Sequence, residues 1–276
     1  MSATVSFQVS APHGPGEVTV SYARVGRGEP LVLLHGIGHH RQAWDPVVDI
    51  LATEREVIAV DLPGFGASPG LPEGLAYDLP TTNAVLGALF EALDLDRPHV
   101  AGNSLGGLLA LELGREKRVR SVTALSPAGF WSPAERRYAF TVLLGMRGIA
   151  RRLPPPVVTG LSRTAAGRTA LTSTIYARPA RRSPAAVVAE TRALATATGF
   201  TATLRAGASV RFTDAVPGLP VTVAWGARDR LLVPRQGVRA KRLIPHARLV
   251  RLPGCGHVPM NDDPALVARV ILDGSR

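Results

Sequence analysis

The chain of 276 residues contains one cysteine, Cys255, which excludes a disulfide within the chain and makes a cytoplasmic protein the default expectation. Lysine occurs only at Lys117 and Lys241, so the net charge of +11 comes almost entirely from arginine. No apolar run is as long as a membrane span, and residues 1–12 lack a basic segment followed by an apolar one. We therefore expect neither a transmembrane segment nor secretion. The sequence also lacks internal repeats and low-complexity tails. It does not predict the oligomeric state.

Apolar residues, by contrast, make up 46% of the chain, enough to bury one large core. Short apolar runs alternate with helical patterns, which favours an α/β fold with a mostly parallel, doubly wound sheet. The first two strands alternate apolar and polar residues instead, so we expect them to pair antiparallel with one face exposed. Eight strands are predicted, at residues 5–9, 18–25, 31–34, 57–60, 99–101, 122–125, 221–225 and 248–252. Helices are predicted at residues 44–52, 81–93, 105–114, 234–244 and 264–272.

This alternation stops in the middle of the chain. Residues 132–135, Ser-Pro-Ala-Glu, fit a capping box with proline at the first helical position, and Ser-Pro at 183–184 begins another helix. The sequence therefore predicts a helical insertion at residues 130–216. The remaining residues, 1–129 and 217–276, would form the core.

The predicted insertion also carries most of the charge. It contains 13 arginines and only three acidic residues, Glu135, Glu190 and Asp214, a balance of +10. We hypothesise that it attracts an anionic partner, which would be an acidic substrate, a carrier-protein surface or an anionic lipid face. Nucleic acid is not expected, because no known binding motif accompanies the charge.

A serine stands at the apex of a predicted strand-turn-helix segment, Gly102-Asn103-Ser104-Leu105-Gly106. Gly-x-Ser-x-Gly in this context is typical of a nucleophile elbow, in which a strained turn holds the hydroxyl clear of the sheet. The two glycines avoid collisions between the turn and its neighbours. The pattern therefore predicts that Ser104 is a nucleophile.

A serine hydroxyl needs a base, a group that orients the base, and donors for an oxyanion. His257, Asp229 and the backbone N–H groups of Ile37 and Leu105 are the candidates. Each lies just after a predicted strand or, for Leu105, at the elbow. Because the carboxyl ends of parallel strands share one edge of a sheet, we expect these residues to converge there.

The chain resembles the α/β-hydrolase superfamily over nearly its whole length. The resemblance rests on five motifs: His35-Gly36, residues 61–68 (DLPGFGAS), residues 102–106 (GNSLG), residues 225–229 (WGARD) and Gly256-His257. It implies that Ser104 is the nucleophile, Asp229 the acid, His257 the base, and Ile37 and Leu105 the oxyanion donors. It favours Asp229 over Asp61, which also follows a strand, and implies that the insertion forms a cap over the catalytic edge.

The function that follows is a serine hydrolase that cleaves a carboxylic ester of a small acyl substrate through an acyl-enzyme, without a cofactor. Three alternatives stay open. The elbow also resembles that of hydrolases that cleave carbon–carbon bonds in ring-fission products, although residues 258–260, Val-Pro-Met, replace their usual aromatic residue. A cofactor-free perhydrolase uses the same triad. A non-catalytic ligand receptor on the same scaffold is the third alternative.

Several other side chains are assigned by type. Apolar residues expected to line the substrate pocket are Trp44, Phe130, Trp131, Met146 and Met260. His35, His39 and His40 share one loop but lack further ligands at matched spacing, so we expect no metal site. Asp262 and Asp263 precede Pro264 and are expected to stabilise the start of a helix.

Overall fold

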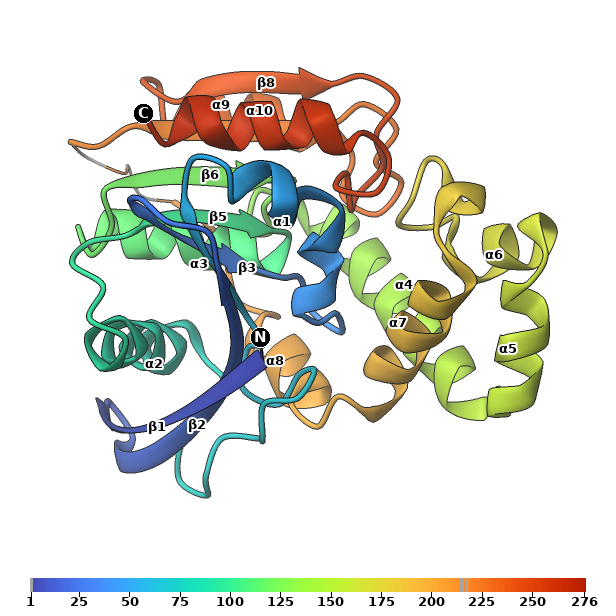
Figure 1. Cartoon of the computed structure of the whole chain (residues 1–276), viewed down its shortest axis with the longest axis horizontal. Coiled ribbons are helices and arrows are strands. Elements are labelled where there is room, and N and C mark those ends of the chain that lie inside the picture. Colours follow the sequence, from blue (N-terminus) through green and yellow to red (C-terminus); the bar gives the residue numbers. More distant parts are fainter. Residues whose placement is uncertain (1, 214–215, 217) are drawn as a thin grey trace.

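The structure, a computed structural model, describes residues 2–213, 216 and 218–276. Its centre is an eight-stranded sheet in the order β1-β2-β4-β3-β5-β6-β7-β8 (Figure 1). The strands are β1 (Ser2–Ala11), β2 (Gly14–Val25), β3 (Pro30–Leu34), β4 (Glu56–Val60), β5 (His99–Asn103), β6 (Ser121–Leu125), β7 (Val221–Gly226) and β8 (Arg248–Leu252). β1 pairs antiparallel with β2, and β2 antiparallel with β4, while all later pairs are parallel. The predicted fold class is confirmed.

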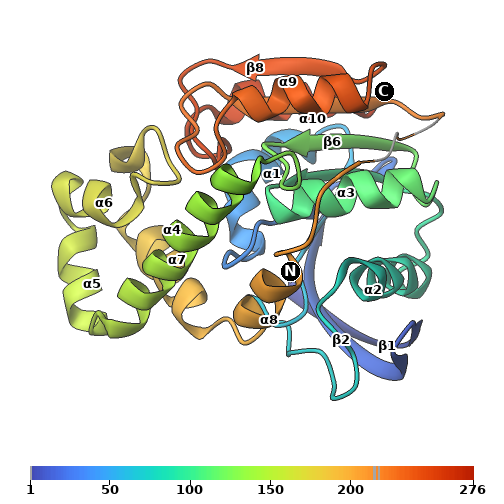
Figure 2. The same cartoon turned by 180° about the vertical axis from the view of Figure 1, so that it is seen from behind.

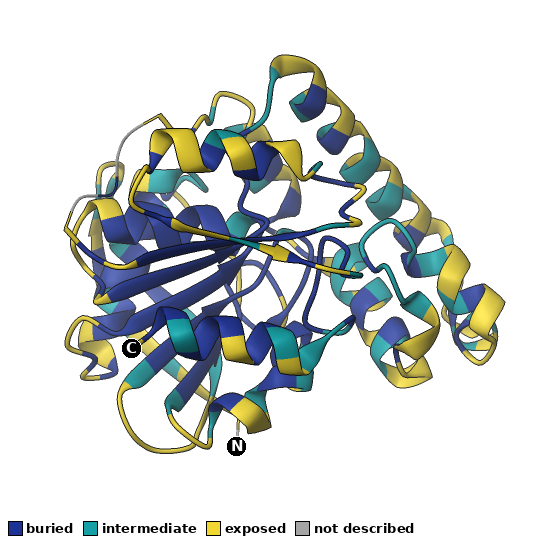
Figure 3. Ribbon diagram, turned by 90° about the horizontal axis from the view of Figure 1, so that it is seen from above, coloured by how far each residue is buried: buried dark blue, intermediate teal, exposed yellow. Residues whose placement is uncertain are grey.

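Helices cover both faces of the sheet because both faces of its central strands are apolar. Val32 and Leu34 of β3 pack in one hydrophobic cluster, whereas Leu31 and Leu33 pack in the other. The first cluster also holds residues of α2 (Leu79–Ala92), α3 (Leu105–Arg115) and α9 (Arg235–Leu243). The second lies beneath α1 (Asp45–Leu51) and α10 (Pro264–Gly274). Figure 3 shows the buried sheet between helices whose outer surfaces are exposed.

A group of helices lies beyond the carboxyl ends of the parallel strands, at the right of Figure 1 and the left of Figure 2. The helices in this part of the chain are α4 (Pro133–Arg152), α5 (Pro155–Ser162), α6 (Ala165–Thr172), α7 (Pro184–Thr196) and α8 (Phe200–Ala206). We call residues 130–216 the cap, and its separation from the core stays our interpretation. Asp214, one of its three acids, and Pro217, where the second core segment was predicted to start, lie outside the described residues.

The predicted helix starts in the cap are confirmed, but three cap helices were not predicted. Ser132 accepts a hydrogen bond from the N–H of Glu135, whose side chain accepts one from the N–H of Ser132, which completes the capping box of α4. The prolines at 154–156 follow the end of α4 and open α5 at once, because proline is favoured in a first helical turn. Helices α6 and α8 are too short to show a clear apolar period.

Among the described residues, none of the helices combines the length and the apolar character needed to cross a membrane. Large apolar side chains are exposed on both the core and the cap; those of the cap are Tyr138, Leu144 and Ile149 of α4 and Val157 of α5.

Candidate active site

Ser104 occupies the sharp turn between β5 and α3. Its backbone has φ 57° and ψ −113°, a left-handed region that is unfavourable for a residue with a side chain. Its N–H donates to the carbonyl of Leu125, 3.0 Å away, which anchors the turn to the neighbouring strand. A Cβ on Gly102 would lie 2.0 Å from the carbonyl oxygen of Gly106, and one on Gly106 would lie 2.1 Å from that of Leu34. Only glycine fits at both positions.

His257 and Asp229 form a buried pair. The Nδ1 of His257 donates to Oδ2 of Asp229 at 2.8 Å, and the two side chains are 4% and 0% exposed. The other carboxylate oxygen of Asp229 accepts from the N–H groups of Leu231 and Leu232, at 2.9 and 2.8 Å. Both oxygens are therefore held in place, and the imidazole is fixed with its proton on Nδ1.

The neighbour of the serine holds the loop of the histidine. The side chain of Asn103 donates to the carbonyl of His257 at 2.9 Å and to that of Leu125 at 3.1 Å. Segments far apart in the sequence are joined at this point by a side chain whose role the motif alone did not reveal. The Ser104 hydroxyl itself makes no hydrogen bond within the described residues.

Asp262 joins the histidine loop to the cap. Its fully buried carboxylate accepts from the N–H of Gly256 at 2.8 Å and from the N–H groups of Ala177 and Arg178, at 2.9 and 2.7 Å. The prediction that Asp262 stabilises the start of a helix is therefore corrected. Asp263 alone caps α10, accepting from the N–H of Leu266 at 3.1 Å.

The loop after β3 brings Ile37 close to the serine. A Cβ on Gly36 would lie 3.1 Å from that of Ser104, so the loop and the elbow are in close contact. Ile37 and Leu105 both line a small cavity beside Ser104, and neither N–H donates a hydrogen bond to any described residue. Leu105 opens α3, where the first N–H groups of a helix lack partners.

The ring of His35 holds this loop in place through two hydrogen bonds. Its Nδ1 donates to the carbonyl of Gly36 at 2.7 Å, since its Nε2 accepts from the N–H of Leu62 at 3.0 Å. Burial lowers the pKa of His35 to about 4, so the ring is neutral near pH 7. A neutral ring suits its double role as donor and acceptor.

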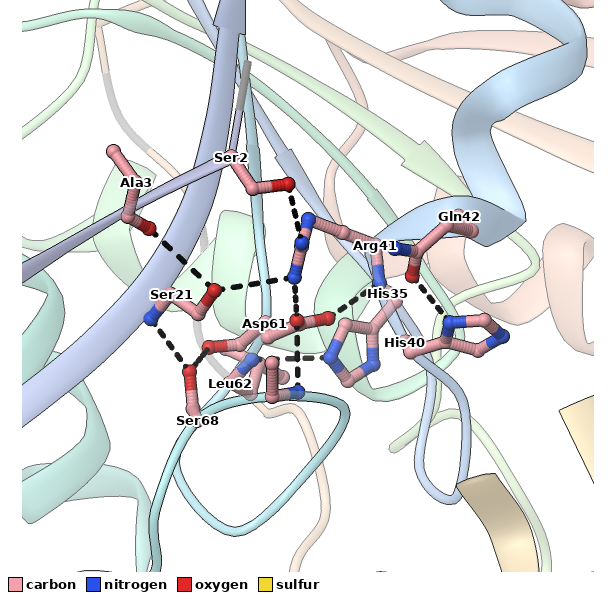
Figure 4. Close-up of polar contacts among 11 residues, drawn as sticks. Ser2, Ala3, Ser21, His35, His40, Arg41, Gln42, Asp61, Leu62 and Ser68 are labelled. Atoms are coloured by element: carbon pink, nitrogen blue, oxygen red, sulfur yellow. Dashed lines mark hydrogen bonds and ion pairs between the residues drawn. The ribbon is translucent and has the colours of Figure 1, made fainter. Parts of the chain in front are cut away.

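Asp61 belongs to a separate polar network around the same loop (Figure 4). It accepts from the N–H of Arg41 at 2.7 Å, forms an ion pair with the Arg41 guanidinium, and accepts from the N–H of Ala67 at 3.0 Å. The Arg41 guanidinium also donates to Ser2 and Ser21, at 2.8 and 3.2 Å. The carboxylate of Asp61 is thus committed to the turn, and Asp229 pairs with His257.

A cavity of about 160 Å³ lies between the sheet edge and the cap. It is lined by Gly36, Ile37, Gly38, His39, Asn103, Ser104, Leu143, Met146, Ile149, Ala150, Leu153, Ala170, Leu171, Thr172, Thr174, Ile175, Glu190, Thr191, Leu194, Leu231, His257 and Val258. Ser104 and His257 therefore face one space. Most of the lining is apolar, which is typical of a site for an apolar acyl group.

The five residues predicted to line this cavity are found in different places. Met146 lines it, and Trp131 lines the smaller neighbouring cavity beside Ser104. Trp44 and Met260 are instead fully buried in the cluster beneath α1 and α10, and Phe130 is buried in the other cluster. The assignment of these three to the pocket is corrected: they are core residues, and sequence type does not distinguish the two roles.

One end of the cavity is polar. Tyr176 donates its hydroxyl to Oε1 of Glu190 at 2.9 Å, and Nε of Arg182 donates to the same oxygen at 2.6 Å. Burial raises the pKa of Glu190, and the charge of Arg182 opposes this shift. His39 lies beside Tyr176, with its Nε2 at 3.4 Å from the hydroxyl. No arginine or lysine of the described chain lines the cavity.

The histidines of the loop after β3 form no metal site within the described residues, and the cysteine is not a second nucleophile. His39 and His40 stack with ring centroids 5.5 Å apart, and no group of three or more metal-ligating side chains occurs in the described part of the chain. Cys255 is buried, and burial raises the pKa of its thiol to about 12. That thiol is therefore a poor nucleophile.

Comparison with known proteins now decides the family. The sequence model described as the alpha/beta hydrolase fold matches residues 29–264, which include all the motifs described above. The chain belongs to the α/β-hydrolase fold family. Its fold and its eight-stranded, mostly parallel sheet are those of this family, and the similar proteins include esterases and other hydrolases.

Two relatives of known name match this chain over shorter stretches. A pimeloyl-[acyl-carrier protein] methyl ester esterase of Aeromonas hydrophila is 39% identical over 111 residues, 40% of this chain and 42% of the relative. A 2-hydroxy-6-oxo-2,4-heptadienoate hydrolase of Pseudomonas putida is 36% identical over 119 residues, 41% of this chain and 43% of the relative. These alignments span less than half of either relative.

Among solved structures, an esterase of Thermogutta terrifontis superimposes with a TM-score of 0.75 at 22% identity. The superposition covers 98% of this chain and 97% of the esterase. At this identity the likeness concerns the fold alone.

Proposed function

We propose that this hydrolase cleaves a carboxylic ester of a small acyl substrate through a Ser104–His257–Asp229 triad. The observation that carries the proposal is the buried His257–Asp229 pair, whose imidazole faces the same cavity as the strained serine. The hydroxyl of Ser104 is free of other protein partners in the described residues, so a hydrogen bond to His257 can form when substrate binds, as is common in unliganded sites.

The reaction proceeds in two halves. His257 takes the proton of Ser104 as its Oγ attacks the carbonyl carbon, and Asp229 stabilises the resulting imidazolium. The N–H groups of Ile37 and Leu105 hold the oxyanion, each contributing about 3 kcal/mol in comparable sites. The alcohol leaves with the proton from His257. Water then attacks the acyl-enzyme by the same route and releases the acid.

The similarity to the ring-fission hydrolase supports carbon–carbon bond cleavage as a second candidate. That substrate is an acid, however, and the described lining of the cavity offers no arginine or lysine to pair with a carboxylate. The largely apolar lining therefore favours the ester. A cytoplasmic location remains a prediction from the sequence.

Active-site labelling tests the proposal. A fluorophosphonate probe should label Ser104, and both Ser104→Ala and His257→Ala should abolish labelling and the hydrolysis of p-nitrophenyl esters of graded chain length. Cys255→Ala, in the loop that carries His257, should keep both. Full ester hydrolysis by Ser104→Ala, with a melting temperature equal to that of the parent, would end the proposal. A ring-fission product in the same screen separates the two candidate reactions.

A further inference from the structure

We propose that the polar end of the cavity is a binding subsite for a neutral hydrogen-bond donor of the substrate, a hydroxyl or amide N–H, with Glu190 and His39 as its acceptors. This inference rests on the proposed function, since it concerns the same cavity. It specifies the substrate class more narrowly: an acyl or alcohol chain that is apolar near the ester and carries one donor group farther away.

Glu190 has one saturated and one vacant carboxylate oxygen. Its Oε1 accepts from both Tyr176 and Arg182, whereas its Oε2 is buried and has no partner among the described residues. The residue lies on α7 and lines the cavity. A buried carboxylate oxygen without a donor costs free energy, so a small rotation of the Glu190 side chain that presents this oxygen to a ligand donor in the cavity is favoured.

His39, which contacts the same Tyr176 hydroxyl and also lines the cavity, supplies a second acceptor. The Tyr176 hydroxyl gives its proton to Glu190, so its oxygen accepts from Nε2–H of His39. The proton of the neutral ring is then on Nε2, and Nδ1 is an acceptor. This Nδ1 is buried and also lacks a partner within the described chain. Burial keeps the pKa of His39 well below its ordinary value, so the ring stays neutral near pH 7.

The charge balance selects a neutral donor over an ion. Arg182 and Glu190 form a buried ion pair, so the carboxylate already has a cation as its partner. An ammonium group would compete with Arg182 for it. A carboxylate or phosphate would meet two acceptors in a cavity whose described lining has no arginine or lysine. A hydroxyl or amide N–H satisfies an acceptor at no charge cost.

Sites built to hydrogen-bond a substrate group discriminate against analogues that lack the group, because the acceptors then stay buried and unpaired. The test compares p-nitrophenyl esters of ω-hydroxy acids with those of alkyl acids of equal length, over chains of about five to nine atoms. We expect kcat/KM for the hydroxy ester to exceed that for the alkyl ester by roughly tenfold or more at one chain length.

Glu190→Gln provides the decisive variant. Tyr176 and Arg182 both donate to Oε1, so the amide oxygen takes that position and the NH₂ group takes the place of Oε2. The vacant acceptor becomes a donor. We expect an ester ending in a methyl ketone, which only accepts hydrogen bonds, to gain kcat/KM in this variant relative to the parent. The hydroxy ester should change less, because its hydroxyl can also accept from the NH₂ group.

Two further variants distinguish a loss of the subsite from a loss of the fold. The double variant Arg182→Met/Glu190→Leu removes both charges of the pair together, and it should erase the preference while alkyl esters are still cleaved. Thr191→Val is the matched control. Thr191 lines the same cavity, but its hydroxyl donates to the carbonyl of Val187, so the preference should be unchanged.

Equal kcat/KM for hydroxy and alkyl esters at every length, or no gain of the methyl ketone ester in Glu190→Gln, would overturn this inference while leaving the triad intact. Failure of the proposed function would look different, because all esters would then be inert and Ser104 unlabelled.

Discussion

At the scale of single residues, buried polar side chains determine the geometry of the site. His35 supports the loop after β3 only as a neutral ring, and Asp229 and Asp262 each have both carboxylate oxygens occupied. Such groups have little freedom to change partner or protonation state. Their contributions can therefore be measured one at a time.

His35 makes stability depend on pH. Its pKa is about 4 in the folded protein against about 6.5 when unfolded, so the unfolded chain binds more protons between these values. Stability should be intact above pH 6.5 and fall by about 3 kcal/mol as the pH drops toward 4. The low pKa of His39 acts in the same direction.

Urea unfolding at several pH values measures this effect. His35→Gln should show a flatter pH dependence than the parent, whereas His246→Gln, at an exposed position, should keep the parent's slope. A His35→Gln curve parallel to that of the parent would show that this ring is not responsible.

Asp262 and Asp263 are neighbours with different roles, which a pair of substitutions separates. In Asp262→Asn, an NH₂ group must face backbone N–H donors, so we expect a loss of about 2–4 kcal/mol in the free energy of unfolding, together with reduced kcat. Asp263→Asn keeps an equally good cap, and its cost should be a few tenths of a kcal/mol. Thermal melts and ester hydrolysis check both; equal losses would contradict the assignment.

At the scale of elements, α3 and α4 contain glycines with opposite consequences. Gly106 of α3 lies against the carbonyl of Leu34, whereas a Cβ on Gly145 of α4 would meet nothing within 4 Å. Gly106→Ala should therefore destabilise the fold by several kcal/mol and displace Ser104, since the neighbour is backbone and cannot yield. Gly145→Ala should stabilise it by about 0.5–1 kcal/mol through helix propensity. The midpoints of denaturant unfolding compare the stabilities of the two variants. A Gly106→Ala variant as stable as the parent would exclude the close contact.

Sequence patterns predicted most of these elements and missed others. Strands β3 to β8 and helices α2, α3, α9 and α10 were predicted within a few residues, because each has a clear apolar period or a defined cap. Helices α5, α6 and α8 were missed, since seven or eight residues hold too little periodicity. Trp44, Phe130 and Met260 were assigned to the pocket because core and pocket use the same residue types.

At the scale of the whole molecule, the positive charge of the cap lies outside the cavity. Of its arginines, Arg182 is buried in an ion pair, and most others are exposed or half-buried. On α4, Arg151 and Arg152 are exposed near Leu144 and Ile149, which also face solvent. The hypothesised anionic partner is therefore expected to act on the outer surface and to be a carrier-protein or lipid surface rather than a small acid.

Salt should reveal this interaction. We expect binding to phosphatidylglycerol vesicles at low ionic strength that falls several-fold toward 0.5 M NaCl, with no such change for neutral vesicles. Arg151→Gln/Arg152→Gln should weaken binding, whereas Arg27→Gln, exposed on the core, should not. If binding to neutral vesicles depends on salt to the same extent, an anionic lipid surface is excluded as the partner. An acidic carrier protein is then the next partner to test.

The sequence by itself determined the resemblance to the family, the order of the strands and of the core helices, and the three residues proposed as the triad. These follow from local signals: apolar periods, turn residues, and motifs whose glycines are required by the chain around them. The tertiary structure alone decided which side chains face the cavity and which polar groups are left without partners. Those properties depend on contacts between segments far apart in the chain, such as Asn103 with His257, Asp262 with the cap, and Glu190 with Tyr176 and Arg182. No local pattern records such contacts.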